Sequence, residues 1–238
     1  MKDNDKTNKQ LINELTDVRQ RITDLEALVF EYKRKEGTLK QNIEKLRSIL
    51  DKSIITLAST VETKDPYSIG HQGRVAKLAC AMAEEMGFSE EQIEEIRLAA
   101  LVHDIGKISV SADLLTRPDG LMDNEYMLIK NHPQNGYDIL EKVEFPDSVA
   151  RIVLQHHERI NGTGYPQGLS GEDIVMGARI LSVADVVEAI ATQRSYRKAL
   201  GIDKALNEIK RYRDLLYDPD AVDACLRLFR DKKFKWDK

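Results

Sequence analysis

The sequence predicts an all-α protein in which a long coiled-coil helix over residues 1–57 precedes a helical globule over residues 58–238. Three observations predict this class: apolar residues recur in heptads up to residue 57, shorter helical segments with recognisable caps follow, and no stretch shows the sustained alternation typical of β-strands. Hydrophobic residues make up 42% of the 238 residues, enough for a real core, while 32% charged residues indicate one much more polar region.

The N-terminal region carries a heptad seam. Its apolar positions are Leu11, Leu15, Val18, Ile22, Leu25, Val29, Tyr32, Leu39, Ile43, Leu46, Leu50 and Leu57, and only Glu36 and Ser53 fall on the stripe without being apolar. β-Branched residues such as Ile22 and Ile43 gather at the a positions and leucines such as Leu25 at the d positions, which favours two parallel strands. We therefore expect a parallel homodimer through this helix. A monomeric amphipathic helix folded back on the globule is the alternative.

Past residue 58 the chain shows the start and stop signals of shorter helices. Gly87 ends one helix, and Ser89 with Gln92 forms a capping box for the next. Further helix starts are expected at Asp123, at Pro146-Asp147 and at Asp203. This region should therefore fold as a mostly helical globule of about 180 residues.

Charge and cysteine content limit the partners and the compartment. A net charge of -4 and a pI near 5.8 argue against a nucleic-acid duplex or an acidic membrane as the main partner. Cys80 and Cys225 lie far apart without metal-binding spacing, and the sequence shows neither a signal peptide nor 18 consecutive uncharged apolar residues. We expect a soluble cytoplasmic chain with reduced cysteines.

All five histidines lie in the second region, at His71, His103, His132, His156 and His157. Any one of them alone is more often a hydrogen-bonded core residue than a ligand. Together they favour a metal site, because a buried imidazole must satisfy two ring nitrogens, and a divalent ion accepts one while a carbonyl takes the other.

Two aspartates complete the expected metal site. Asp104 follows His103 at a helix end, where the loss of helical geometry lets neighbouring side chains turn toward one cavity, and its two oxygens could join two ions. Asp185 is the lone acid in the apolar stretch 180–187. A solvent-facing aspartate is the alternative for Asp185, but its valine and alanine neighbours disfavour exposure.

The order of these blocks resembles the HD-GYP family of cyclic di-GMP phosphodiesterases. The matching blocks are His71, "HDIGK" at 103–107, His132, "HHERINGTGYPQGL" at 156–169 and "ADVVEAI" at 184–190, within about residues 58–225. The resemblance implies an HD-domain fold with two divalent metal ions, iron or manganese. It implies one metal at His71, His103, Asp104 and Asp185, and a second that Asp104 bridges to His132 and His156, with His157 beside it.

The resemblance also assigns residues around the substrate. Lys107, Gly164 and Tyr165 match positions that the family uses there, and Lys107 with Asp104 is the expected catalytic pair. Arg194 and Arg197 match phosphate-binding positions, and Asp65 one that meets a guanine edge. The loop residues also fit on chemical grounds, since glycines allow close backbone approach and a tyrosine offers a flat face for a base. A surface lysine and a plain surface loop are the alternatives.

The sequence departs from the family pattern at three positions. Asn161 stands where an aspartate usually precedes the loop, and Ser195 replaces a common proline. Members with three metals carry a glutamate four residues before the first histidine, where this chain has Tyr67. We therefore expect two metals rather than three.

These observations predict a metal-dependent hydrolase that converts cyclic di-GMP to linear pGpG and, on further cleavage, GMP, in bacterial second-messenger signalling. The N-terminal helix would relay a signal from an upstream sensor or partner. Three alternatives stay open: a non-catalytic scaffold, an HD phosphohydrolase of another nucleotide, and a di-iron oxygenase.

Overall fold

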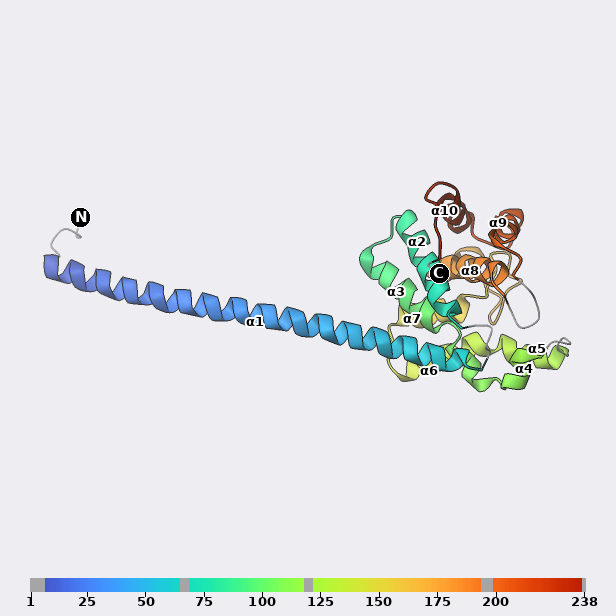
Figure 1. The fold of residues 1–238 in the computed structure, drawn as a ribbon, viewed down its shortest axis with the longest axis horizontal. Helices are drawn as coiled ribbons and strands as arrows, with labels where there is room; N and C mark the ends of the chain where they lie inside the picture. Colours follow the sequence, from blue (N-terminus) through green and yellow to red (C-terminus); the bar gives the residue numbers. More distant parts are fainter. Residues whose placement is uncertain (1–6, 65–68, 118–121, 194–198, 237–238) are drawn as a thin grey trace. The chain divides into compact units, whose positions relative to one another are not determined.

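The computed structural model describes residues 7–64, 69–117, 122–193 and 199–236. Within these ranges the regular structure is helical, joined by two isolated β-bridges, Asn161 with Ser170 and Arg213 with Tyr217. This confirms the predicted all-α class (Figure 1). The chain divides into two compact units, Met1–Lys52 and Ser53–Lys238. The expected domain boundary after residue 57 lies inside the first helix and stays a prediction.

The first helix, α1 (Asn8–Glu62), is a single element of 55 residues. It passes without a break through the Glu36-Gly37 step, so the long N-terminal helix expected from the heptads is confirmed. The apolar seam residues named above are between 44% and 65% exposed. A continuous exposed apolar stripe of this length is typical of a helix that pairs with another helix.

The second unit contains the shorter helices. The longer ones are α2 (His71–Glu85), α3 (Glu90–Val102), α6 (His132–Lys142), α7 (Asp147–Gln155), α8 (Met176–Ala191), α9 (Ile202–Arg211) and α10 (Pro219–Arg230). The short ones are the 3-10 helices η2 (Ile105–Ser109) and η3 (Gly171–Asp173), with α4 (Ala112–Thr116) and α5 (Asp123–Lys130). The expected starts near 123, 147 and 203 agree with α5, α7 and α9 to within one residue.

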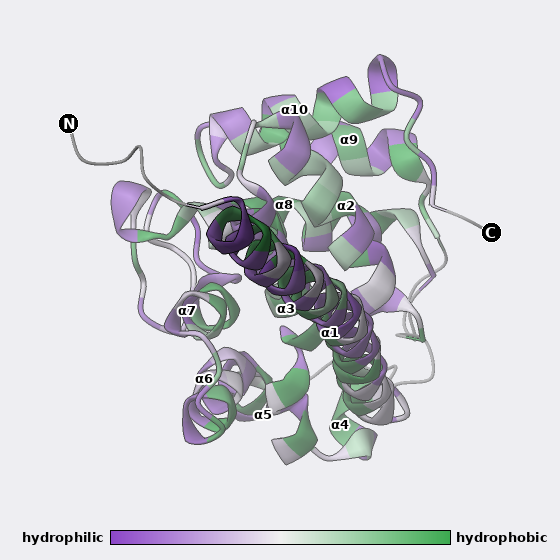
Figure 2. Ribbon diagram, turned by 90° about the vertical axis from the view of Figure 1, so that its left-hand side faces the viewer, coloured by the Kyte–Doolittle hydropathy of each residue, from purple (hydrophilic) through white to green (hydrophobic). Residues whose placement is uncertain are grey.

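Helix α8 lies at the centre of the core. It is the most apolar of the longer helices, and it packs against α2, α7, α9 and α10. Ile180 and Leu181 of α8 and Leu78 and Met82 of α2 are fully buried. By contrast α10 carries both apolar and polar residues along its length (Figure 2), as expected of a helix with one face in the core.

Local sequence signals set the boundaries of α2 and α3. Gly87 has φ of 80°, a left-handed conformation that glycine adopts without strain, and it follows the end of α2. The backbone N–H of Gln92 donates to the Ser89 hydroxyl at 3.3 Å, and the Ser89 N–H donates to the Gln92 side chain at 3.1 Å. The predicted capping box is therefore confirmed, and it fixes the start of the helix that leads to His103.

Two further expectations concern the cysteines and membrane spans. Cys80 and Cys225 are both free thiols. Among the described residues, no helix combines the length and the apolar character needed to cross a bilayer.

We predict opposite stability effects for two helical glycines. A Cβ at buried Gly177 would lie 2.5 Å from Ile152 Cδ1, so Gly177→Ala overpacks the contact between α7 and α8. Overpacking costs ~1–3 kcal/mol and exceeds the ~1 kcal/mol that alanine gains over glycine in a helix. Gly73 has open space around it, so Gly73→Ala should raise the free energy of unfolding by ~0.5–1 kcal/mol. Urea unfolding of both variants measures the difference, and a destabilised Gly73→Ala with an unchanged Gly177→Ala would contradict the packing described here.

Candidate metal centre

Three of the histidines bond to carbonyls of a preceding helix: His103 and His156 cap the C-terminal ends of α3 and α7, and His132 lies just past the end of α5, as the first residue of α6. Nδ1 of His103 donates to the Ala100 carbonyl (2.7 Å), Nδ1 of His132 to the Ile129 carbonyl (2.8 Å), and Nδ1 of His156 to the Val153 carbonyl (2.6 Å). The last carbonyls of a helix have no partner within the helix, so a following imidazole can donate to them. Each bond places the proton on Nδ1 and leaves the Nε2 lone pair free to bind a metal.

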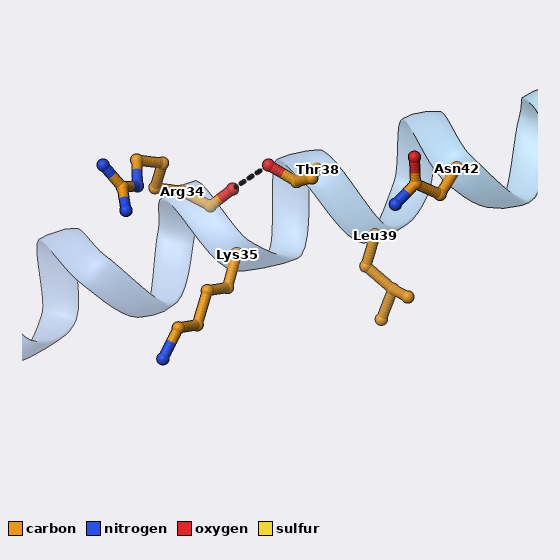
Figure 3. Close-up of a pocket in the computed structure, with 5 residues that line it drawn as sticks. All are labelled: Arg34, Lys35, Thr38, Leu39 and Asn42. Atoms are coloured by element: carbon orange, nitrogen blue, oxygen red, sulfur yellow. Dashed lines mark hydrogen bonds between the residues drawn. The ribbon is translucent and has the colours of Figure 1, made fainter.

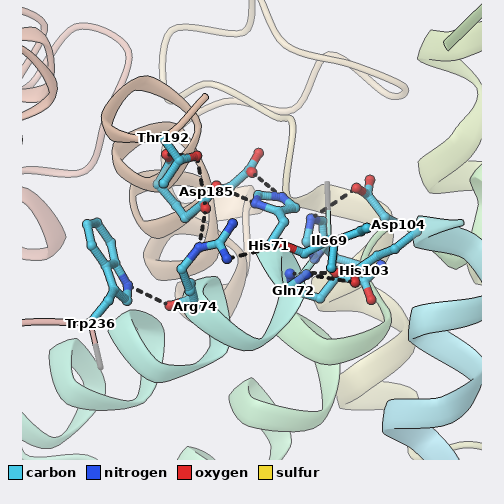
Figure 4. A network of polar contacts seen from close by, with 12 residues as sticks. Ile69, His71, Gln72, Arg74, His103, Asp104, Asp185, Thr192 and Trp236 are labelled. Atoms are coloured by element: carbon cyan, nitrogen blue, oxygen red, sulfur yellow. Dashed lines mark hydrogen bonds and ion pairs between the residues drawn. The ribbon is translucent and has the colours of Figure 1, made fainter. Parts of the chain in front are cut away.

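His71, the first residue of α2, is held by a carboxylate instead of a helix carbonyl. Its Nδ1 donates to Glu188 Oε2 at 2.5 Å, and Glu188 Oε1 accepts from Arg74 Nε at 2.7 Å (Figure 4). Its Nε2 lies 3.1 Å from Asp185 Oδ1. Glu188 is fully buried, so Arg74 and His71 balance a carboxylate that would otherwise be costly to desolvate.

Glu188 had no expected role from the sequence, where Asp185 was identified as the lone acid of the stretch 180–187. A signal was present: Glu188 follows Asp185 by three residues, and residues three apart share one face of a helix. An acid on the same face of an apolar helix as an expected ligand indicates a second carboxylate near the site.

The structure brings the separate sequence blocks together at one centre. Three sets of residues each bring their ligand atoms to within 4.8 Å of one another. They are His71, His103 and Asp185; His103, Asp104 and His156; and His132, His156 and His157. These residues come from the segments around α2, α3, α6, α7 and α8. Every histidine and both aspartates expected at the metal site are therefore members of one cluster. Their individual roles as ligands stay predictions.

Asp104 belongs to the second of these sets, which shares His103 with the first set and His156 with the third. Its backbone has left the helical region, with φ of -94° and ψ of 5°, as expected for a residue just past a helix end. Its Oδ2 accepts from Lys107 Nζ at 2.7 Å, and Oδ1 lies 3.3 Å from His132 Nε2. Asp104 is only 4% exposed, and Oδ1 has no hydrogen-bond partner among the described residues. A buried carboxylate oxygen without a donor indicates a place for a cation.

The protonation states favour metal binding. Burial would raise the pKa of Asp104, but Lys107 and the neighbouring imidazoles hold it well below its ordinary value. Burial would also raise the pKa of Asp185, but the hydrogen bond with His71 and the electrostatic influence of the neighbouring imidazoles together hold it well below its ordinary value. Burial lowers the pKa of His132 to about 4 and those of His156 and His157 well below the ordinary value. The acids are therefore ionised and these imidazoles neutral, as metal ligands must be.

One close contact supports the same conclusion on geometry alone. Nε2 of His132 lies 3.4 Å from Nε2 of His156, while both Nδ1 atoms donate to carbonyls. Two neutral imidazoles in this arrangement direct lone pairs toward one another, which is unfavourable unless a cation lies between or beside them. Together with the unpartnered Asp104 oxygen, this contact shows that the residues fit a divalent metal.

The glycine of the HDIGK block explains how Asp104 reaches His132. A Cβ at Gly106 would lie 2.0 Å from the His132 carbonyl oxygen and 2.6 Å from the Gly136 nitrogen. Only a glycine lets η2 approach the start of α6 this closely. The glycine therefore sets the separation between the two ligand-bearing segments.

Glu158 anchors the loop after His157. It is buried, and its carboxylate accepts three backbone N–H bonds, from Gln167 (2.7 Å), Gly168 (3.2 Å) and Leu169 (3.1 Å). In the sequence this glutamate is part of the matching block 156–169, and no role was expected for it. The structure shows that it folds the loop back toward the histidine pair.

The loop carries Gly164 and Tyr165 to the edge of the cluster. A Cβ at Gly164 would lie 2.4 Å from the Arg159 nitrogen, so the expected close backbone approach is present. The Tyr165 ring stacks on His157, with ring centroids 4.7 Å apart and 30° between planes. Burial raises the pKa of Tyr165, which keeps its hydroxyl protonated as a donor. The ring thus stacks on His157, and Lys130 Nζ also lies over it, 5.3 Å from the ring centroid.

The remaining expected residues are placed as follows. Lys107 is half-buried and bonded to Asp104 rather than exposed. Asp65, Tyr67, Arg194, Ser195 and Arg197 lie outside the described residues.

A shallow hollow on α1 carries no comparable chemistry (Figure 3). Its lining is Arg34, Lys35, Thr38, Leu39 and Asn42, all on one stretch of exposed helix. The Thr38 hydroxyl donates to the Arg34 carbonyl at 3.1 Å, an ordinary bond within a helix.

Comparison with known proteins assigns the family. The family model for the HD domain matches residues 56–221 of this chain. The chain therefore belongs to the HD-domain family, and the resemblance to HD-GYP proteins stated from the sequence is confirmed.

Three relatives illustrate the similarity. The cyclic di-GMP phosphodiesterase response regulator RpfG of Xanthomonas campestris is 40% identical over 72% of this chain and 46% of its own length. The 3'3'-cGAMP-specific phosphodiesterase 3 of Vibrio cholerae is 35% identical over 75% of this chain and 40% of its own length. The solved structure of Bd1817, an HDG"Y"P protein from Bdellovibrio bacteriovorus, superposes with a TM-score of 0.58 at 25% identity, covering 68% of this chain and 52% of that one. The chain thus spans less than half the length of the two enzymes.

We predict that Glu188→Gln weakens metal binding. The amide cannot accept from both His71 and Arg74 as the carboxylate does, so His71 loses its fixed orientation. Affinity for Mn²⁺, measured by competition with a chelator, should fall about tenfold to a hundredfold. Glu172→Gln, at an exposed position of η3, is the matched control and should leave the affinity unchanged. Equal affinities for both variants would show that Glu188 does not orient a ligand.

Proposed function

We propose that this chain is a metal-dependent phosphodiesterase that cleaves cyclic di-GMP. The observation that supports this proposal most strongly is the buried cluster of five imidazoles and two carboxylates, with an unpartnered Asp104 oxygen at its centre. Membership of the HD-domain family and the names of the relatives support the same reaction class.

The proposed cofactors are two divalent metal ions, iron or manganese. His71, His103, Asp104 and Asp185 would hold one, and Asp104, His132 and His156 the other, with His157 beside it. Bound ions of this kind supply positive charge that polarises a phosphate and lowers the pKa of water. Mixed nitrogen and oxygen ligands suit iron and manganese, whereas the absence of a cysteine from the set disfavours a thiolate-type site.

Lys107 and Tyr165 are the residues that we propose to act on the substrate. Lys107 Nζ bonds to Asp104 Oδ2 at the edge of the cluster, so its charge is placed to neutralise a phosphate oxygen near the metals. The Tyr165 hydroxyl, kept protonated by burial, can donate to the substrate. Gly164 lets the loop carry this ring over His157. We propose in addition that Asp65 contacts a guanine and that Arg194 and Arg197 bind phosphate.

The product follows from cleavage of one or both phosphodiester bonds. Opening of one bond gives linear pGpG, and a second cleavage gives GMP. A second candidate substrate is 3'3'-cGAMP, because one of the similar proteins is named for that activity.

For the N-terminal region we propose a parallel homodimer. The seam residues are exposed along α1, with β-branched residues at the a positions and leucines at the d positions. A dimer would bury this stripe and connect residues 58–238, the proposed catalytic domain, to an upstream sensor or signalling partner. The two free thiols agree with the proposed cytoplasmic location.

The proposed activity can be tested on anaerobically purified protein loaded with Mn²⁺ or Fe²⁺. We expect hydrolysis of cyclic di-GMP, and we expect Asp104→Asn to reduce the rate by about a hundredfold or more, because loss of a ligand should exceed the 10- to 100-fold cost typical of its supporting residues. Asp113→Asn, an exposed aspartate of α4, is the matched control. Faster turnover of 3'3'-cGAMP would favour the second substrate, and no turnover of either by metal-loaded protein would refute the phosphodiesterase.

The proposed dimer can be tested by sedimentation equilibrium. Leu25→Glu removes one apolar side chain from each helix of the dimer, and burial of each leucine stabilises the dimer by ~1.5 kcal/mol. The dimer should weaken by about 3 kcal/mol, or about a hundredfold in Kd. Ala27→Glu places the same charge off the stripe and should leave the Kd unchanged. A wild-type chain that is monomeric at micromolar concentration would contradict the dimer.

A further inference from the structure

We propose that Glu62 and Lys64, where α1 ends, are positioning residues that hold the two backbone segments carrying His71 and Asp104 in register. The inference rests on the proposed metal-dependent function and names a structural link between the N-terminal helix and that site. Neither side chain is a member of the metal-ligand sets, so both would act through other residues.

Glu62 caps the helix that begins with His71. Its Oε2 accepts from the Gly70 N–H at 2.9 Å and its Oε1 from the Gln72 N–H at 3.2 Å, so the carboxylate bonds to the backbone on both sides of His71. The cap residue of α2 is Gly70, which has no side chain to satisfy these N–H groups. A carboxylate at a helix N-terminus is favourable because it pairs with orphan donors and with the helix dipole.

Several features show that this cap is built into the fold. Glu62 is 7% exposed, although glutamate is seldom buried without partners. Gly70 has φ of 74°, and a Cβ there would lie 2.8 Å from Arg74 Nη1. Arg74 in turn donates to the Ile69 carbonyl at 3.2 Å and to Glu188. In Figure 4 the labelled Ile69, His71, Gln72 and Arg74 lie around the start of α2. The position of His71 is therefore set from two sides, by Glu188 at its ring and by Glu62 at its backbone.

Lys64 holds the other segment. Its Nζ donates to the Ile108 carbonyl at 2.6 Å and to the Val110 carbonyl at 3.2 Å, at the end of η2. Within η2 the Lys107 N–H donates to the Asp104 carbonyl at 2.9 Å, and the Val110 N–H donates to the Lys107 carbonyl at 2.9 Å. These bonds make one short rigid turn from Asp104 to the carbonyls that Lys64 binds.

The two contacts are complementary and lie two residues apart in the chain. An anion at Glu62 receives N–H donors, and a cation at Lys64 donates to carbonyls, so each charge is matched to the backbone groups it meets. His71 and Asp104 are proposed ligands of the same ion, and 33 positions separate them in sequence. A displacement of the end of α1 would therefore move one ligand-bearing segment relative to the other, which is how a signal along α1 would reach the metals.

The test uses the full-length chain and measures Mn²⁺ affinity by chelator competition, together with the melting temperature of the metal-free protein. Glu62→Ala and Lys64→Met should each lower the affinity about tenfold, with less effect for Glu62→Gln, which keeps one acceptor. Lys64→Arg should recover most of the loss, because a guanidinium can donate to both carbonyls. Glu44→Gln and Lys45→Met, exposed positions of α1 off the seam, are the matched controls and should leave affinity unchanged.

The outcomes separate the possible explanations. Weaker metal binding in the variants, with melting temperatures close to wild type, supports positioning, and in the hydrolysis assay kcat should fall more than KM rises. A lower melting temperature with unchanged Mn²⁺ affinity would reduce both residues to structural supports and overturn the proposal. If the wild type binds Mn²⁺ yet hydrolyses no cyclic dinucleotide, the proposed function fails while the affinity comparison still decides this inference. If the wild type binds no Mn²⁺, both fail.

Discussion

The second unit is organised around two carboxylates, Asp104 and Asp185, whose charges the described protein atoms offset only in part. Ionised Asp104 and Asp185 are buried with neutral imidazoles whose lone pairs converge, and one oxygen of Asp104 has no donor among the described residues. In an apolar interior such an arrangement is costly unless cations compensate it. The helices that carry these side chains must therefore keep them close together although like charges and lone pairs repel one another. The close-packed apolar core around α8 holds those helices in place.

Backbone groups carry much of the positioning. Helix carbonyls fix the tautomers of His103, His132 and His156, so groups that every helix end leaves unsatisfied become the support of the site. Buried glutamates act next: Glu188 at an imidazole and Glu158 at the loop. Both glutamates use the same interaction: a buried carboxylate accepts hydrogen bonds from backbone N–H groups or from a ring nitrogen.

Much of this structure could be predicted from local patterns. The heptads predicted α1, and the capping box predicted the start of α3. The apolar surroundings of Asp185 marked it as a candidate ligand, and the resemblance to the HD-GYP family predicted that His71, Asp104 and Asp185 lie together. Glu188 and Glu158 were not predicted in their roles, because their partners are far away in sequence and only the folded chain places them together. The contact of Gly106 with His132 is of the same kind: a glycine is visible in the sequence, but the backbone that it approaches is not.

The way in which Glu158 holds its loop has an evolutionary consequence. The Glu158 carboxylate accepts only from the main chain at 167–169, so the bonds themselves use none of the side chains there. Gly168, with φ of 67°, and Leu169, which packs against the core, are constrained for other reasons, whereas Gln167 is exposed. Substitutions at Gln167 can therefore alter the surface beside Tyr165 while the fold of the loop is preserved. Descendants of one ancestor could thus diverge in the surface that this loop presents, with the histidine cluster and its supports left intact.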